Sequence, residues 1–402
     1  MSQTPKVTVC IASYNHAKYL PATLESVLGQ DFSGFEVILV DDGSSDNSFE
    51  VAESYAKADS RIRVFRHPGN ANRGISATWN KIVSESQGMY LAWIGSDDLW
   101  YPEMLTAMMS MLDDHADIGL GYAYADVVDG DGNLIAGKRV GEDITLSDMP
   151  ILDMICRDPV PGLTAIVRKV CIDAVGPFHE ELVCSDWEMW VRIMLRWKVG
   201  FVSRSVGAYR IHDSNISIHT PQNRGHVEID LVRMLGVMEA LQSHVAAFKG
   251  DPVPPSVSAM ISLQAAYFSY QLGYVEKAKT CLAVVFDKDP LLFSPSPLMI
   301  TWLRGSATPW LKLERGSRAL DRGFGRWMIS ELESLVVHRS NPSLVDEIAG
   351  AEYVGELCKL LHDGDVAKAR WRVIRALIRR PRWVLGRHRR KQNLSALLGH
   401  LF

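Results

Sequence analysis

Residues 89–101 read MYLAWIGSDDLWY, and the rest of the chain is organised around this stretch. Its apolar run, residues 89–94, has the character of a buried strand, and a Gly-Ser turn then delivers two adjacent carboxylates, Asp97 and Asp98. In an alternating α/β chain, ligands bind at the carboxyl ends of strands. Carboxylate oxygens suit Mg²⁺ or Mn²⁺, so one interpretation is a divalent-metal site that serves a phosphate-bearing ligand. The alternative is a pair of N-cap residues ahead of the next helix.

The segments before this stretch alternate between strand and helix patterns. Apolar, β-branched runs predict strands over residues 6–13, 37–40, 61–66 and 89–94, and helical spacing predicts helices over 20–29, 49–58 and 75–86. The order β-α-β-α-β-α-β predicts an α/β fold with a mostly parallel sheet and helices on both faces.

Polar side chains follow three of these strands. Tyr14 and Asn15 follow the first strand, Asp42 follows the second, and the acids of residues 97–98 follow the fourth. We expect these ends to share one rim of the sheet. An aromatic ring there could stack on a base, a carboxylate could accept the N3-H of uracil or thymine, and the paired acids could hold a metal on a diphosphate. The alternative for VDDGSSD, residues 40–46, is a turn followed by an N-cap.

Four short segments in combination resemble the signature series of the family 2 glycosyltransferases, which have the nucleotide-sugar-binding GT-A fold. They are ASYN at 12–15, VDDGSSD at 40–46, NANRGISATWN at 70–80 and GSDD at 95–98. The similarity continues through residues 160–217 and so predicts a catalytic domain over residues 1–218. The first motif of the family usually reads Pro-Thr-Tyr-Asn, and this chain departs from it in the first two positions.

The resemblance implies a role for each matching residue of the donor site. Tyr14 and Asn15 would belong to the nucleotide site. Asp42 would bind the uracil N3-H, Asp98 would coordinate the metal, and Asp97 would contact the ribose or the water shell of the metal. Arg73 and Asn80 would lie over the nucleotide, although a surface arginine opening a helix is an alternative for Arg73.

The segment SDWEMW, residues 185–190, is expected at the acceptor side. The family has an acid followed by aspartate here, and this chain keeps only the aspartate. The resemblance makes Asp186 the catalytic base that takes the proton from the acceptor hydroxyl. Trp187 and Glu188 are candidate contacts to the acceptor or the diphosphate. The alternative for Asp186 is an N-cap.

The segment YRIHDSNIS, residues 209–217, resembles another family motif, tyrosine-arginine-x-histidine ending in serine. It implies that Arg210 or His212 contacts the diphosphate or the metal once a loop closes over the donor, with His212 as the candidate metal ligand and Arg210 as a candidate contact to the acceptor or the diphosphate. The alternative is a solvated loop histidine.

Residues 219–402 predict an all-α domain. A glycine and a proline seventeen residues apart occur twice, at 273–290 and 364–381, which resembles two tetratricopeptide-type helical hairpins. Residues 367–391 carry eleven basic residues and no acid, and without them the net charge of -4 would be -15. This basic tail predicts contact with an anionic membrane surface, the alternative being solvated arginines. The acidic body argues against nucleic acid.

The composition limits the class of protein and its expected cellular location. The chain has 402 residues, 47% of them hydrophobic, and no run of about twenty apolar residues. The six cysteines have no paired spacing, so we expect them to be reduced. The first residues lack the pattern of a signal peptide, so we expect a cytoplasmic protein, with a peripheral position on the inner face of the cell membrane as an option.

The sequence therefore predicts an inverting, Mn²⁺- or Mg²⁺-dependent glycosyltransferase. It would move a sugar from a UDP- or dTDP-linked donor to a hydroxyl of a glycan or lipid-linked glycan in bacterial surface polysaccharide or O-antigen synthesis. A sugar nucleotidyltransferase would need a glycine-rich, arginine-containing loop after the first strand, and ASYNHAKYL has none. The remaining rival is a non-catalytic nucleotide-sugar-binding scaffold that recruits partners through the helical domain.

Overall fold

The computed structural model describes residues 4–147, 149–156, 158–182, 185–215, 227–248, 250, 252–289, 327–328 and 331. The chain divides into two compact units. One unit consists of residues 1–154 and 158–225, and the other of residues 155–157 and 226–402. The domain boundary predicted at residue 218 stays a prediction.

Four parallel strands form the first half of the sheet in the first unit. They are β1 (Val7–Ser13), β2 (Phe35–Asp41), β3 (Ile62–Arg66) and β4 (Tyr90–Gly95), in the order β3-β2-β1-β4. The connecting helices are α1 (Leu20–Leu28), α2 (Ser48–Ala58) and α3 (Ile75–Glu85). The predicted order of these seven elements is confirmed.

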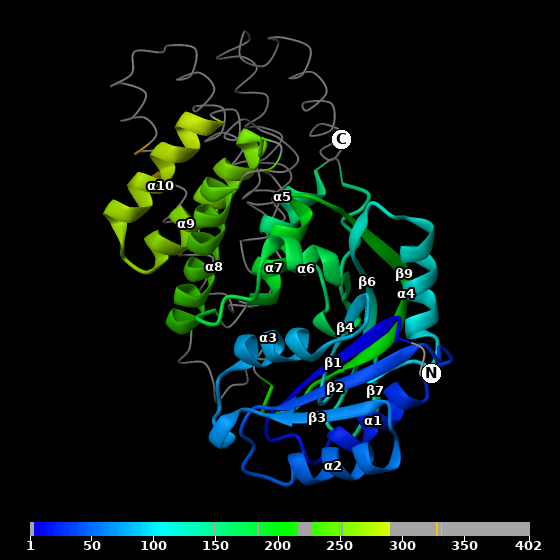
Figure 1. Cartoon of the computed structure of the whole chain (residues 1–402). Coiled ribbons are helices and arrows are strands. Elements are labelled where there is room, and N and C mark those ends of the chain that lie inside the picture. The colour runs from blue at the N-terminus through cyan, green and yellow to red at the C-terminus, as the bar shows by residue number, and fades with distance from the viewer. Residues whose placement is uncertain are drawn as a thin grey trace. The chain divides into compact units, whose positions relative to one another are not determined.

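The helices cover both faces of these strands. In Figure 1, α1 and α2 lie on one face and α3 lies on the other. Their sequences explain this packing, because α1 buries Leu20, Leu24 and Val27 on one side, and α3 buries Ala77 and Ile82.

The register brings the strand ends to one rim. Ser13 lies opposite Asp41, and Ala12 lies opposite Gly95. The expectation that the first, second and fourth strands present their polar ends together is therefore confirmed.

The second half of the sheet is mixed, which the prediction of a mostly parallel sheet did not anticipate. It contains β5 (Leu99–Trp100), β6 (Ile118–Val128), β7 (Leu134–Val140), β8 (Ile166–Arg168) and β9 (Lys198–Arg210). β8 is antiparallel to β4 and β6, β9 is parallel to β6, and β5 is antiparallel to β9. β7 is antiparallel to β6. Only the β6-β7 pair is a hairpin, whereas the other antiparallel pairs join strands that are far apart in the sequence.

The 3-10 turn η1 (Pro68–Asn70) lies between β3 and α3. Along the second half of the sheet the chain forms α4 (Met104–Asp114), α5 (Pro150–Cys156), η2 (Gly162–Thr164), α6 (Lys169–Val175) and α7 (Ser185–Met194), and the last residues of α5 belong to the second unit. The pairing of Leu99 with Ala208 is the contact that matters for the site, because it carries the end of β9 to the residues that follow β4.

The second unit contains α8 (Val227–Ala247), α9 (Pro255–Gln271) and α10 (Val275–Lys288). α9 and α10 form a helical hairpin whose turn holds Gly273 at φ +80°, a conformation that glycine adopts without strain, and Ala278 is buried in it. Residues 364–381 and the basic tail of residues 367–391 lie outside the described residues, so the second hairpin and the membrane contact stay predictions. Among the described residues, no helix has the length and apolar character that a membrane span requires.

Candidate active site

The turn after β4 folds two carboxylates back over Gly95. A Cβ atom at Gly95 would lie 2.7 Å from Asp97 Oδ1 and 2.7 Å from Asp98 Oδ2, so only glycine leaves room for both acids. The N-H of Asp98 donates to the carbonyl of Gly95 at 3.2 Å, and the hydroxyl of Thr23 on α1 donates to the carbonyl of Asp98 at 2.8 Å. The two acids are thus fixed at the rim by backbone contacts.

The end of β9 binds directly to these acids. The backbone N-H of Arg210 donates to Asp98 Oδ1 at 2.9 Å, and its Nε donates to the carbonyl of Asp97 at 2.6 Å. The guanidinium of Arg210 also lies 5.3 Å from the centre of the Tyr19 ring. Burial, and then the charge of Asp97, raise the pKa of Asp98 well above its ordinary value. The carboxylate of Asp98 therefore anchors β9, and its predicted role as a metal ligand stays a prediction.

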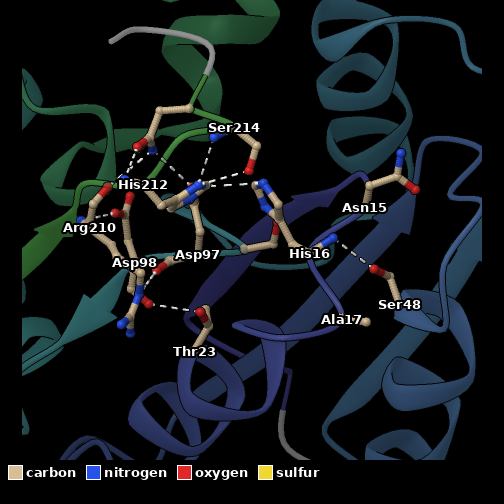
Figure 2. A network of polar contacts seen from close by, with 12 residues as sticks. Asn15, His16, Ala17, Thr23, Ser48, Asp97, Asp98, Arg210, His212 and Ser214 are labelled. Carbon is tan, nitrogen blue, oxygen red and sulfur yellow. Dashed lines mark hydrogen bonds and ion pairs between the residues drawn. The ribbon is translucent and has the colours of Figure 1, made fainter. Parts of the chain in front are cut away.

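Asp97 has two imidazoles beside it (Figure 2). His212 Nε2 lies 2.9 Å from Asp97 Oδ2, and His16 Nε2 lies 3.9 Å from the same oxygen. Each of the three side chains offers a ligand atom, and these atoms lie within 4.8 Å of one another. Asn215 also donates to Asp97 Oδ2, at 3.3 Å, and the Tyr19 ring stacks on His212 with a centroid distance of 4.4 Å. The structure thus places the predicted His212 against Asp97.

His16 is a site residue that the sequence analysis missed. It follows Asn15 in the loop after β1, and its Nδ1 lies 2.8 Å from the hydroxyl of Ser96. Burial lowers the pKa of His16, while the charge of Asp97 opposes this shift. A signal was present in the sequence, because His16 follows Tyr14 and Asn15 at the end of the first strand, and that end was expected to lie near Asp97 and Asp98.

The two residues before His16 have different exposures and partners. The Tyr14 ring is 46% exposed, so a base can reach its face. Asn15 has a left-handed φ of 54°, and its Oδ1 accepts the N-H groups of Ser45 at 2.8 Å and Asp46 at 3.4 Å. Its side chain therefore holds the loop after β2 in place beside Tyr14.

Asp42 closes the loop that precedes α3. Its Oδ1 accepts the N-H of Arg73 at 2.7 Å and its Oδ2 accepts the N-H of Gly74 at 3.0 Å. Each carboxylate oxygen has a second lone pair, which leaves capacity for a base N-H. The side chain of Arg73 is exposed.

The predicted nucleotide residue Asn80 is engaged elsewhere within the first unit. Its Oδ1 accepts the N-H of Phe178 and its Nδ2 donates to the carbonyl of Phe178, both at 2.9 Å. This reciprocal pair ties α3 to the loop before α7. The amide of Asn80 therefore has a structural partner, and its predicted contact with the nucleotide stays a prediction.

The predicted base, Asp186, lies in the first turn of α7. It is partly buried, it accepts the N-H of Trp187 at 2.9 Å, and burial raises its pKa above the ordinary value. A second acid that the sequence analysis missed, Asp158, interacts with it. Burial, and then the charge of Asp186, raise the pKa of Asp158 well above the ordinary value. The two carboxyl groups therefore ionise as a pair.

The other two predicted contacts on α7 lie in the interior. The Nε1 of Trp187 donates to the carbonyl of Met154 at 2.6 Å, and the indole is 3% exposed. Glu188 is fully buried and forms an ion pair with Arg192 at 2.8 Å. Their partners among the described residues are structural, and the predicted contact of either side chain with the acceptor or the diphosphate stays a prediction.

Comparisons with known proteins identify similar sequences. The family model described as Glycosyl transferase family 2 matches residues 8–171. EpsH of Bacillus subtilis, which is named as a glycosyltransferase, is 34% identical over 226 residues, or 53% of this chain and 63% of that protein. The GalNAc(5)-diNAcBac-PP-undecaprenol beta-1,3-glucosyltransferase of Campylobacter jejuni is 24% identical over 240 residues, or 58% of this chain and 74% of that protein.

The solved structures support the fold. The crystal structure of S. aureus TarS 1-349 in complex with UDP superposes with a TM-score of 0.51 at 17% identity, covering 84% of this chain and 92% of that chain. The matched stretch spans 63 to 66% of the length of the first three curated relatives, just under two thirds. Residues 8–171 therefore match glycosyltransferase family 2, and this part of the chain has the GT-A fold.

Proposed function

We propose that this chain is an inverting, cation-dependent glycosyltransferase that uses a UDP- or dTDP-linked sugar and a hydroxyl acceptor. The observation that carries the proposal is the convergence of β9 on the turn after β4. There Arg210 and His212 contact the two acids at the carboxyl rim of a parallel sheet. A rim of this kind is where α/β folds bind nucleotides.

The proposed donor site begins at the ends of β1 and β2. Tyr14 presents an exposed ring for the face of a base, and Asp42 is held by two backbone N-H groups with lone pairs left for an N3-H donor. Uracil and thymine both carry N3-H, whereas cytosine has only an acceptor at that position. The UDP bound to the S. aureus TarS structure supports a uridine donor as the first to test.

The residues beside the proposed donor site fit a divalent cation. Metal bonds to imidazole nitrogen and carboxylate oxygen are about 2.0 to 2.2 Å long, so two ligands at right angles lie about 3 Å apart. His212 Nε2 and Asp97 Oδ2 lie 2.9 Å apart, the length of a hydrogen bond, and a cation that replaced the shared proton would need nearly the same spacing. A bound divalent ion would act as a Lewis acid and neutralise charge that develops on the leaving diphosphate. Asp97 faces both imidazoles, and Asp98, whose Oδ1 accepts the N-H of Arg210, can offer its Oδ2 as a further oxygen ligand.

The proposed base is Asp186. Ionised, its carboxylate takes the proton of the acceptor hydroxyl, and the oxygen then attacks the anomeric carbon on the side opposite to the diphosphate, which inverts the configuration. The raised pKa of Asp186 makes its carboxylate a stronger base than an exposed one, while the group still ionises as the pH rises. Arg210 holds the backbone of Asp97 at the rim.

The proposed acceptor belongs to a glycan of the bacterial cell surface, either free or linked to a lipid. The name of the Campylobacter relative, which acts on an undecaprenol diphosphate-linked oligosaccharide, supports the lipid-linked form. We propose a cytoplasmic location, with the basic tail of residues 367–391 on the inner face of the membrane.

The first test is a donor screen. Nucleotides that bind the folded chain raise its unfolding temperature, so UDP, dTDP and GDP are compared with and without MnCl₂. Slow hydrolysis of the matching nucleotide sugar then reports turnover. We expect UDP or dTDP to stabilise the protein more than GDP.

Asp186→Asn separates chemistry from binding. We expect it to lower turnover by about 10²- to 10⁴-fold and to leave donor-induced stabilisation unchanged, because the amide cannot accept the proton. Asp173→Asn is the matched control, since Asp173 is an exposed acid on α6. Turnover by Asp186→Asn at the rate of the unsubstituted protein would remove the base assignment. Tight donor binding with neither hydrolysis nor transfer would favour the non-catalytic scaffold.

A further inference from the structure

The loop after β1 contributes an imidazole to the same carboxylate oxygen that faces His212. His16 Nε2 lies 3.9 Å from Asp97 Oδ2, and the rings of His16 and His212 stand perpendicular with centroids 5.5 Å apart. Figure 2 shows the two rings approaching Asp97 from different segments. Three donor atoms thus converge from the first strand end, the fourth strand end and the end of β9.

The orientation of both rings is set by hydroxyl groups. His16 Nδ1 lies 2.8 Å from Ser96 Oγ, and His212 Nδ1 lies 2.8 Å from Ser214 Oγ. An imidazole that ligates a metal through one nitrogen uses its other nitrogen to bind a partner that fixes the ring. In both rings the Nε2 atom is the one directed at Asp97.

The His16 backbone is also fixed. Its N-H donates to Ser48 Oγ at 2.9 Å, and its carbonyl accepts the N-H groups of Tyr19 and Leu20, both at 2.9 Å. The side chain is 18% exposed, whereas those of Asp97 and His212 are 12% and 4% exposed. His16 is therefore the most open member of the group and lies on its solvent side.

We propose that His16 is the third protein ligand of this cation site, so that two imidazoles and one carboxylate bind Mn²⁺ or a later first-row divalent ion in preference to Mg²⁺. The inference rests on the proposed function, in which a bound cation would neutralise charge on the donor diphosphate.

The chemistry of the ligand set carries the selectivity. Mg²⁺ takes oxygen ligands in a near-ideal octahedron and dehydrates reluctantly, so nitrogen ligands favour transition metals over it. Among the three side chains only Asp97 supplies an oxygen and a negative charge. Asp98 can add a second carboxylate oxygen through Oδ2, since the N-H of Arg210 occupies only its Oδ1. The two imidazole nitrogens still make the site match Mn²⁺, Fe²⁺ or Co²⁺ better than Mg²⁺.

The test uses the full chain with Mn²⁺ as the probe, with and without UDP. The free-ion electron paramagnetic resonance signal gives the affinity for Mn²⁺, and competition by Mg²⁺ gives the selectivity. Spin-echo modulation from ¹⁴N reports how many imidazoles bind the ion. We expect two coordinated imidazoles and at least a tenfold preference for Mn²⁺.

Two variants test His16. His16→Ala removes the ligand, and His16→Gln keeps a polar side chain that can bond to Ser96, which guards against a folding defect. Both should show one coordinated imidazole and bind Mn²⁺ about tenfold or more weakly, since loss of an outer-shell partner alone costs about that much. Their affinity for Mg²⁺ should change less than about threefold, as expected for an ion that seeks oxygen. His115→Ala is the control, because His115 is exposed and lies on the segment after α4.

The outcomes separate the inference from the proposed function. Two-imidazole modulation that persists in His16→Ala, or equal affinities for Mg²⁺ and Mn²⁺ in the unsubstituted protein, would overturn the inference and leave the transferase proposal standing. A His16-dependent Mn²⁺ site in a protein that binds no nucleotide would support the ligand set and reject the donor proposal.

Discussion

Arg192 offers the sharpest test of how the fold positions the proposed base. It lies on α7, the helix that begins beside Asp186, and it is 1% exposed. Its guanidinium forms an ion pair with the fully buried Glu188 at 2.8 to 2.9 Å. The same group donates to the carbonyls of residues 175–177 at 2.8 to 3.2 Å, directly after α6. Arg192→Leu removes all of these contacts at once.

The magnitude follows from what is left behind. Breaking a buried ion pair by removing one partner costs about 3 to 5 kcal/mol, because the other charge stays buried without compensation. Here Glu188 loses its partner, and burial already raises its pKa, so the acid takes up a proton more readily in the variant and recovers part of the cost. The carbonyls of residues 175–177 also lose their donor. We therefore expect a destabilisation of about 3 kcal/mol, which is about a hundredfold in an equilibrium constant.

Hydrogen exchange of the full chain measures this effect where it arises. Amide protection in α7, residues 185–194, should fall by about a hundredfold, while protection in β1 and β2 should fall less, provided that α7 opens before the sheet does. Turnover should also fall, because the proposed base Asp186 lies on α7 and loses its fixed position when that helix opens. Arg196→Leu is the matched control, since Arg196 is exposed and its Nη1 donates to the carbonyl of Ala174 at 3.3 Å, and it should change protection less than threefold. Unchanged α7 protection in Arg192→Leu would refute the reasoning.

Three further predictions concern the site itself. The rate of transfer under subsaturating donor should rise with pH as Asp186 loses its proton. Because burial raises the pKa of Asp186, the rate should reach half its maximum at a pH above about 3.9, the pKa of an exposed aspartate. A half-maximal rate at or below that pH would contradict the assignment of a buried base. Ser96→Ala should weaken Mn²⁺ binding by about tenfold without removing a ligand, because the His16 ring loses the hydroxyl at its Nδ1; unchanged affinity in the paramagnetic resonance titration would show that Ser96 does not orient the ring. If the exposed ring of Tyr14 stacks on the base, Tyr14→Ala should weaken UDP binding by about 1 to 3 kcal/mol in calorimetry and leave the affinity for Mn²⁺ unchanged. The same UDP affinity in the variant and the unsubstituted protein would exclude stacking.

Local patterns were sufficient for the first half of the sheet. Strands and helices from residue 7 to residue 95 form where apolar periodicity predicted them, because each is short, regular and flanked by turn residues. The polar residues at the ends of β1, β2 and β4 share a rim for the same reason, since parallel strands align their carboxyl ends.

The second half of the sheet was less predictable. The two-residue strand β5 is too short to show any periodicity, and its partner in β9 lies more than a hundred residues away. The antiparallel place of β8 between β4 and β6 depends on which edges are free for pairing, which no local pattern records. On α7, no local pattern showed that Glu188 would be buried with Arg192.

The sequence by itself determined the fold class, the rim that carries the site, and the acids and aromatic ring expected there, because these follow from periodicity and from residues adjacent in the chain. Only the tertiary structure decided which carboxylate faces the imidazoles. Asp97 and Asp98 are neighbours with the same chemistry, and the arrival of β9 separates their roles, since the Arg210 N-H occupies Asp98 while His212 reaches Asp97. His16 is far from Asp97 in the sequence, and only the folded chain brings its imidazole close to the Asp97 carboxylate.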